Sequence, residues 1–144
     1  MRMWAWLAMC GVAAGCVVPA SGPLVSYRVT GDAIVAPLTA EAGDPERGRK
    51  VFEGRDGNCF LCHTVPGGRF MGNLASPLAG VGARLNEGQL RLRVVDSMRL
   101  NRDTIMPSYY RTEDLNQVAA AWRGKPLLAP QEIEDTVAYL LTLR

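Results

Sequence analysis

Residues 59–63 read Cys59-Phe60-Leu61-Cys62-His63, and this short run constrains the structure more than any other part of the chain. The two cysteines are three positions apart, so a single helical turn places both thiols on one side. Thiols with this spacing, followed directly by a histidine, form the attachment pattern for c-type haem, in which sulfur bonds to the porphyrin and imidazole to the iron. We predict one covalently bound haem c per chain, with Cys59 and Cys62 as attachment residues and His63 as an iron ligand.

Three other kinds of site use paired cysteines: a zinc site, a thioredoxin-like redox pair and a structural disulfide. A structural zinc site needs four nitrogen or sulfur ligands, whereas the folded domain offers at most three. A thioredoxin-like pair follows a strand, but Arg55-Asp56-Gly57-Asn58 has the composition of a turn. A disulfide between the two cysteines is the remaining alternative to haem attachment.

The chain has one histidine, so a second imidazole for the iron cannot come from it. Our candidate for the opposite ligand is Met106, because Pro107 biases that methionine toward an extended conformation on a stiff loop. A thioether ligand favours reduced iron and raises the potential. The alternative is that Met106 fills the core, the role we expect for Met98 on its amphipathic helix. Met71 follows His63 by only eight residues.

The first 20 residues have the pattern of a signal peptide, with one arginine followed by an apolar run over 3–18. Val18-Pro19-Ala20 fits ordinary cleavage and would start the mature chain at Ser21. Alternatively, Ala13-Ala14-Gly15-Cys16 resembles a lipobox, in which case the signal ends at residue 15 and Cys16 carries a lipid. Both routes export the protein, so we expect a periplasmic location, with membrane attachment only if Cys16 is lipidated.

After the leader we expect an extended segment over 21–42 and one small all-α domain over 43–144, wrapped around the haem. The composition is 48% hydrophobic and 21% charged, which excludes a disordered or fibrous chain. The formal charge is +2, with no long run of like charges, so the sequence offers no electrostatic footprint for nucleic acid.

Three helices are predicted in that domain. The first begins after Asp44, which is placed to cap it, with Pro45 at the first helical position. The second begins at Asn86, whose spacing from Gln89 is that of a capping box. The third covers residues 130–143. Between them, the Gly- and Pro-rich stretches predict turns, at 67–68, 77–82 and 124–126.

Apolar stripes on the second and third helices are expected to face the core. The stripe of the second helix consists of Leu90, Val94 and Met98. The stripe of the third consists of Ile133, Val137, Leu140 and Leu141, and the opposite, solvent-facing side of Glu132, Glu134 and Asp135. A weak alternation over 24–38 predicts a short extended segment packed on the domain.

Motifs spread along the chain resemble, in their order, those of the class I cytochrome c family. They are Gly43-Asp44-Pro45-x-x-Gly48-x-x-x-Phe52, Cys59-x-x-Cys62-His63, Pro77-Leu78-x-Gly80-Val81-Gly82, Met106-Pro107 and Tyr139-Leu140. The resemblance implies that the first and last helices cross closely, with Gly48 and Phe52 against Tyr139 and Leu140.

The same resemblance implies two contacts around the haem. The carbonyl of Pro77 would accept a hydrogen bond from the ring of His63, which orients the imidazole. Arg84 resembles the family's basic residue near a haem propionate, and a solvated surface arginine is the alternative.

A more specific set of motifs, covering nearly all of the chain after the leader, resembles the SoxX family of bacterial sulfur-oxidising systems. The motifs are Gly31-Asp32-Ala33-Ile34, Gly80-Val81-Gly82-Ala83-Arg84-Leu85, Gln89-Leu90-Arg91-Leu92-Arg93, Thr104-Ile105-Met106-Pro107-Ser108-Tyr109-Tyr110-Arg111 and Trp122-Arg123-Gly124-Lys125-Pro126. Haem binding does not require the tyrosine pair or the Arg-Gly-Lys-Pro run. Leu74-Ala75-Ser76 departs from the Gly-Pro-like run that is more usual in the family, which leaves the geometry of that loop open.

This second resemblance implies an electron-transfer subunit that is not an enzyme on its own and has no catalytic residues. SoxX subunits pair with a larger c-type cytochrome, SoxA, in the heterodimeric SoxAX enzyme of L-cysteine S-thiosulfotransferase type. That enzyme joins thiosulfate to a cysteine of the carrier protein SoxYZ. By implication, this chain accepts electrons from the SoxA haem and passes them to a soluble cytochrome.

Arginines on and after the second helix predict a partner-facing or anion-attracting patch, with a solvated helix face as the alternative; they are Arg91, Arg93, Arg99 and Arg102. Two other functions remain open. One is a free-standing periplasmic electron carrier without a permanent partner. The other is a haem-based ligand-binding sensor in which Met106 is weakly bound or displaced.

Overall fold

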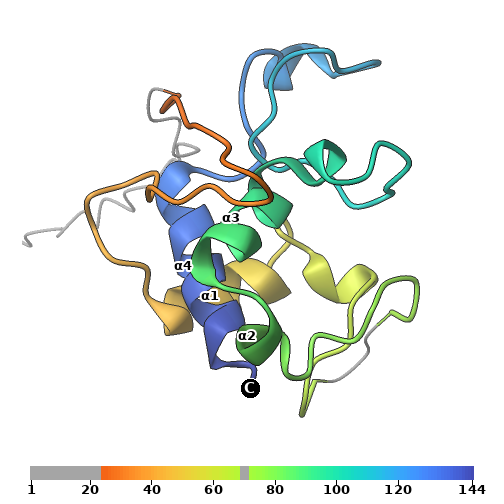
Figure 1. Ribbon diagram of the computed structural model, residues 1–144. Helices are drawn as coiled ribbons and strands as arrows, with labels where there is room; N and C mark the ends of the chain where they lie inside the picture. Colours follow the sequence, from red (N-terminus) through yellow and green to blue (C-terminus); the bar gives the residue numbers. More distant parts are fainter. Residues whose placement is uncertain (1–23, 69–71) are drawn as a thin grey trace, which may run out of the picture.

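The computed structural model describes residues 24–68 and 72–144, which form four α-helices and three short 3-10 helices. They are α1 (Pro45–Glu53), η1 (Cys59–Leu61), α2 (Val81–Arg84), α3 (Glu87–Asp96), η2 (Ser97–Arg99), η3 (Ala120–Trp122) and α4 (Pro130–Thr142) (Figure 1). The two described ranges contain no strand, so the predicted all-α fold is confirmed. None of their helices has the length and apolar character needed to cross a bilayer. The predicted leader, with Cys16, and Met71 lie outside the described residues.

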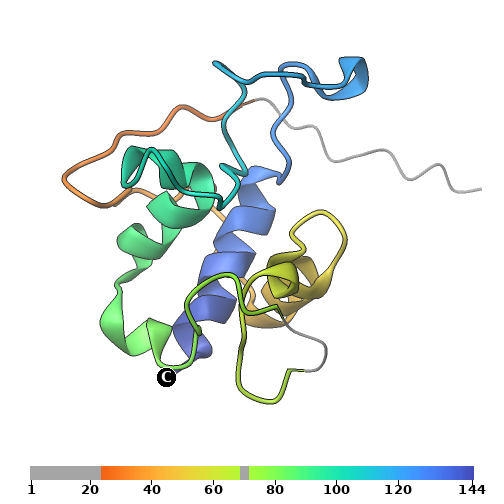
Figure 2. The same cartoon turned by 90° about the vertical axis from the view of Figure 1, so that its right-hand side faces the viewer.

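The first helix begins where the sequence predicts and crosses the last one closely. The side chain of Asp44 caps α1 by accepting the N–H of Arg47 at 2.7 Å, with Pro45 next in the chain. Both views show α1 packed across α4 (Figures 1 and 2). At the crossing point, a Cβ on Gly48 would collide with the backbone carbonyl of Asp135. Glycine is therefore required for this approach of the two helix backbones.

Aromatic packing continues the contact between α1 and α4 toward the cysteine motif. Phe52 is buried, and its ring meets those of Tyr139 and Phe60 edge to face, at centroid distances of 5.4 and 5.1 Å. The expected contact between Phe52 and Tyr139 is thus confirmed. The α4 atoms nearest to Gly48 belong to the backbone of Asp135 and Thr136, about one helical turn before Tyr139.

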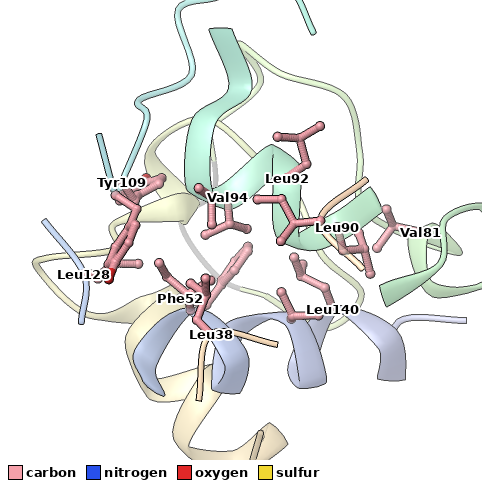
Figure 3. Close-up of a cluster of buried hydrophobic side chains, with 14 of the residues drawn as sticks. Leu38, Phe52, Val81, Leu90, Leu92, Val94, Tyr109, Leu128 and Leu140 are labelled. Carbon is pink, nitrogen blue, oxygen red and sulfur yellow. The ribbon is translucent and has the colours of Figure 1, made fainter. Parts of the chain in front are cut away.

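All four α-helices and the loops between them contribute to one hydrophobic core (Figure 3). Its labelled members are Leu38, Phe52, Val81, Leu90, Leu92, Val94, Tyr109, Leu128 and Leu140. The half-buried side chains of Cys59 and Met106 pack against this same core. Segments far apart in the sequence are therefore brought together around the haem motif.

The start of α3 is predicted correctly, but the helix ends at Asp96, before Met98 of the predicted stripe. The side chain of Asn86 accepts the N–H of Gln89, and the Gln89 side chain accepts the N–H of Asn86, both at 3.0 Å. Leu90 and Val94 are buried as expected. Met98, however, is 38% exposed, because α3 ends two residues before it and η2 changes the direction of the chain. The expectation that Met98 packs in the core is wrong.

Two acidic residues of α4 contradict the predicted solvent face. Glu134 and Asp135 are both almost completely buried, at 3% and 2% exposure. Asp135 accepts hydrogen bonds from the guanidinium of Arg47 at 2.7 and 2.9 Å and from the N–H of Asp44 at 2.8 Å. Burial alone would raise the pKa of Asp135, but these hydrogen bonds outweigh it and hold the pKa below its usual value. The carboxylate therefore belongs to the contact between α4 and α1.

Glu134 fixes the N-terminal segment through a buried ion pair. Its carboxylate binds the guanidinium of Arg91 with two hydrogen bonds of 2.7 and 2.8 Å and also accepts the N–H of Leu38 at 2.8 Å. Arg91 in turn donates to the carbonyl of Ile34 at 2.8 Å. Residues 34–38, within the stretch predicted to pack on the domain, are thus held on α3 and α4.

The predicted turn over 77–82 includes the start of α2, a helix that the sequence analysis missed. Gly80 precedes α2 with a φ of 71°, and the N–H of Gly82 donates to the carbonyl of Leu143 at 3.0 Å. A helix of four residues is too short to show a hydrophobic period. The hydrogen bond to the end of α4 therefore stabilises α2, and this contact cannot be predicted from the local sequence.

Gly48→Ala tests the helix crossing. The added methyl group would force α1 away from α4, so we expect the free energy of unfolding of the haem-loaded protein to fall by about 1–3 kcal/mol. Urea denaturation measures this change. Lys50→Ala, at an exposed position of α1, is the control and should change stability by less than about 0.5 kcal/mol. Equal stabilities of the two variants would contradict the crossing.

Candidate functional site

The turn before the cysteines is set by close backbone packing. Gly57 is buried, and a Cβ there would collide with a backbone carbonyl of α1. Asn58 follows with a φ of 44°, in the left-handed region that asparagine tolerates better than most residues. The N–H groups of Cys62 and His63 then bond to the carbonyl of Cys59 at 3.2 and 2.9 Å. Both cysteines and the histidine therefore share one helical turn, as predicted.

Cys59 and Cys62 are half-buried free thiols, so the structure has no disulfide between them. Burial raises the pKa of the Cys59 thiol to about 11, although a hydrogen bond with Tyr109 acts in the opposite direction. Before attachment, this thiol is therefore protonated at neutral pH. Within 24–68 and 72–144, no three His, Cys, Asp or Glu side chains are grouped to hold a metal ion. The zinc alternative finds no support.

The ring of His63 is oriented by one hydrogen bond. Its Nδ1 lies 2.8 Å from the carbonyl oxygen of Ser76, so Nδ1–H donates and Nε2 is left as the nitrogen that can bind a metal. The resemblance placed this carbonyl on Pro77, which is wrong by one residue. The N–H of Leu78 bonds to the carbonyl of Thr64 at 2.9 Å and aligns the loop so that Ser76 meets the ring.

Met106 comes from a different loop, the one that follows η2. Its carbonyl accepts the hydroxyl of Ser97 at 2.8 Å, and its N–H donates to the hydroxyl of Thr104 at 3.2 Å. The side chain is half-buried against the core to which Cys59 also packs. Hydrogen bonds thus hold the backbone of Met106 at both its N–H and its carbonyl. The side chain of Met98, by contrast, is exposed on η2.

Tyr109 joins the Met106 loop to the cysteine turn, a role that the sequence analysis missed. Its buried hydroxyl donates to the carbonyl of Gly57 at 2.6 Å. Its N–H donates to the carbonyl of Val94 at 3.2 Å, and its carbonyl accepts the N–H of Leu127 at 2.8 Å. The only signal for this role in the sequence was that Tyr109 and Tyr110 form a pair that haem attachment does not require.

The predicted patch of arginines does not form. Arg91 is 1% exposed in its ion pair, and Arg93 is half-buried and donates to a carbonyl of its own helix. Arg99 and Arg102 are exposed, and they line a cleft of about 840 Å³ together with Arg111. Carboxylates in the same lining balance their charge; they are Asp96, Glu113 and Asp114. The cleft is therefore not a strongly basic surface.

Arg84, at the end of α2, is exposed. Its guanidinium donates to the carbonyl of Ala79 at 2.6 Å. Its role near a haem propionate stays a prediction.

The family comparison matches residues 45–144 to the family described as Cytochrome c. The chain belongs to the cytochrome c family. A chain of the crystal structure of SoxXA from P. pantotrophus is similar to this cytochrome with a TM-score of 0.74 and 34% sequence identity. The match covers 81% of this chain and 93% of that chain. A comparison with curated protein sequences gave no significant match.

As a cytochrome c, the protein carries covalently bound haem c and functions in electron transfer. The donor set on this chain fits that group, because two free thiols share a helical turn with an imidazole whose Nε2 is available. The similarity to SoxXA also confirms the predicted resemblance to the SoxX family. Such a subunit transfers electrons and is not an enzyme on its own.

Tyr109→Phe tests the tie between the Met106 loop and the cysteine turn. Removing the hydroxyl leaves the buried Gly57 carbonyl without its partner, so the free energy of unfolding of the haem-loaded protein should fall by about 1–3 kcal/mol. Hydrogen exchange should become faster in residues 54–58. Tyr110→Phe is the matched control, because the Tyr110 hydroxyl instead accepts the N–H of Val25 at 2.8 Å. Unchanged protection of 54–58 in Tyr109→Phe would refute the tie.

Proposed function

We propose that this cytochrome is the SoxX-like subunit of a heterodimeric SoxAX complex in the periplasm. It would accept electrons from the haem of a SoxA-type partner during thiosulfate oxidation and pass them to a soluble cytochrome. The proposal rests on 34% identity across 93% of a chain in a SoxXA structure. The predicted signal peptide over 1–20 supports the periplasmic location, and lipidation of Cys16 would add attachment to the membrane.

Four residues hold the cofactor in this proposal. Cys59 and Cys62 would attach it through thioether bonds, and His63 and Met106 would bind its iron. Bound haem c supplies a one-electron couple at the iron. The carbonyl of Ser76, 2.8 Å from Nδ1 of His63, orients the imidazole and increases its basicity. The neutral sulfur of Met106 favours the reduced state and raises the potential.

The chain itself has no group left for bond-forming chemistry on thiosulfate. Cys59 and Cys62 are the only cysteines of the predicted mature domain when the leader is removed at Ala20, and both are used for attachment. His63 and Met106 would both be used to bind the iron. Joining thiosulfate to a thiol of a SoxYZ-like carrier releases electrons, and we assign that reaction to the SoxA-type partner. This chain would remove those electrons one at a time.

Exposed apolar side chains that are near the haem-binding residues or near Ser76 in sequence suit a short-lived contact with the soluble acceptor. Leu61 lies between the two cysteines, Leu74 precedes Ser76 in the loop, and Ile105 directly precedes Met106. They are 64%, 68% and 74% exposed, respectively. Small interfaces are typical of weak electron-transfer encounters, so these three side chains are our candidate for the exit side of the electron.

Met106→Ala tests the iron ligand. We expect haem to stay attached through Cys59 and Cys62, while the reduced protein becomes able to bind carbon monoxide and the potential falls. Absorbance spectra and a redox titration measure both effects. Met98→Ala, which changes an exposed methionine, is the control and should behave as the wild type. An unchanged spectrum and potential in Met106→Ala would show that the ligand is another group, and rapid carbon monoxide binding by the wild type would favour the sensor function.

A reconstituted reaction tests the place of this chain in electron transfer. Thiosulfate and the carrier protein are added to the oxidised cytochrome with and without the SoxA-type subunit, and the absorbance of this haem is followed. We expect reduction only when the partner is present. Reduction without it would overturn the assignment of the chemistry to that partner. Failure of the two proteins to associate would instead favour a free-standing electron carrier.

A further inference from the structure

Residues 112–127 form an arm that projects from the helical body. Both views show it in cyan to light blue, on the side opposite to α2 and the C-terminus (Figures 1 and 2). No residue of the arm is buried, whereas Tyr110 and Leu128, just beyond its two ends, are part of the core. The arm therefore contributes little to the stability of the fold.

The tip of the arm is a turn held by its own backbone. The N–H of Trp122 donates to the carbonyl of Ala119 at 2.9 Å, and the N–H of Lys125 donates to the carbonyl of Trp122 at 3.1 Å. Gly124 closes the turn with a φ of 69°. Trp122 and Arg123 are thus presented on an ordered turn, which lowers the entropy lost when a partner binds them.

The side chains of the tip combine exposed apolar surface with unpaired positive charge. Trp122 is 41% exposed and Leu115 is 44% exposed. Arg123 and Lys125 are exposed and form no ion pair with any residue in the described ranges. The sequence has no acidic residue between Asp114 and Glu132. Tryptophan and arginine are the types most enriched where binding energy concentrates in protein interfaces.

A small cavity lies beside this tip. Its volume is about 310 Å³, and its lining includes Leu115, Val118, Arg123 and the acidic Asp114. The carboxylate of Asp114 lies 3.4 Å from the guanidinium of Arg111, outside the tip, and so already has a basic partner. The hollow therefore offers apolar groups and the guanidinium of Arg123 to a side chain of a partner. The charge at the tip complements a negative surface, unlike the larger cleft, in which arginines and carboxylates balance.

We propose that this arm is a docking element for the SoxA-type subunit, which covers Trp122 with an apolar pocket and surrounds Arg123 and Lys125 with carboxylates. The identity of the partner rests on the proposed function. A permanent partner fits better than the soluble acceptor, because long-lived interfaces are more hydrophobic than transient electron-transfer contacts.

The test measures the dissociation constant between the haem-loaded chain and the haem-loaded SoxA-type subunit of the same organism, at low and high salt. Trp122→Ala should raise the constant by at least about 30-fold, the effect of losing a central interface anchor. The double change Arg123→Glu and Lys125→Glu should weaken binding more at low salt than at high salt. The matched controls are Val35→Ala, at an apolar side chain that is 72% exposed, and Arg28→Glu, at an exposed arginine.

The arm variants should keep the wild-type haem spectrum and thermal midpoint, since the arm buries no side chain. Binding by the wild type together with arm variants that match their controls would overturn the docking role of the arm and leave the proposed function standing. Arm variants that bind the subunit normally but reduce the soluble cytochrome more slowly would overturn it too, by assigning the arm to the acceptor. A wild type that does not bind the subunit at all would overturn both proposals.

Discussion

At the point where α1 crosses α4, the backbone of Gly48 lies directly against the carbonyl of Asp135. This contact sets the distance between the two helices, and Phe52 can reach Tyr139 and Phe60 because the helices are so close. The cysteine motif follows α1 after a short turn, whose Gly57 packs against the same helix. The position of the haem-binding turn therefore depends on a helix contact that contains no haem ligand.

Two buried carboxylates reinforce this arrangement from α4. Asp135 binds the start of α1 through Arg47, and Glu134 binds α3 and the N-terminal segment through Arg91. Arg91 and Glu134 are both buried, and removing one partner of such a pair leaves an uncompensated buried charge, a loss of about 3–5 kcal/mol in measured cases. Two neighbouring residues of α4 thus connect three other parts of the chain. These ion pairs and hydrogen bonds explain why acidic side chains are buried beside the hydrophobic stripe of this helix.

The haem site and the arm divide the molecule into two functional regions. The site is built from two loops that a single tyrosine hydroxyl connects. Tyr109, three residues after Met106 in the chain, donates this hydroxyl to the turn before Cys59. The arm begins soon after that tyrosine and returns to the core at Leu128. In our proposals, one region holds the cofactor and the other holds the partner. Tyr109 also accepts the N–H of Leu127 at the end of the arm, so it links the two regions.

Local patterns in the sequence were enough to predict the haem motif, the helix starts at Asp44 and Asn86 and the all-α fold. These features depend on groups that are near one another in the chain, such as a cap and the N–H groups it satisfies or two thiols in one turn. Tertiary packing decided four other features. They are the hydrogen bond of the imidazole to Ser76 instead of Pro77, the burial of Arg91 with Glu134, the exposure of Met98 and the hydrogen bond of the Tyr109 hydroxyl. Each of these features joins groups that are distant in sequence or depends on where a helix ends. A charged side chain is predicted to be solvent-exposed unless its buried partner is known, and the sequence alone does not reveal that partner.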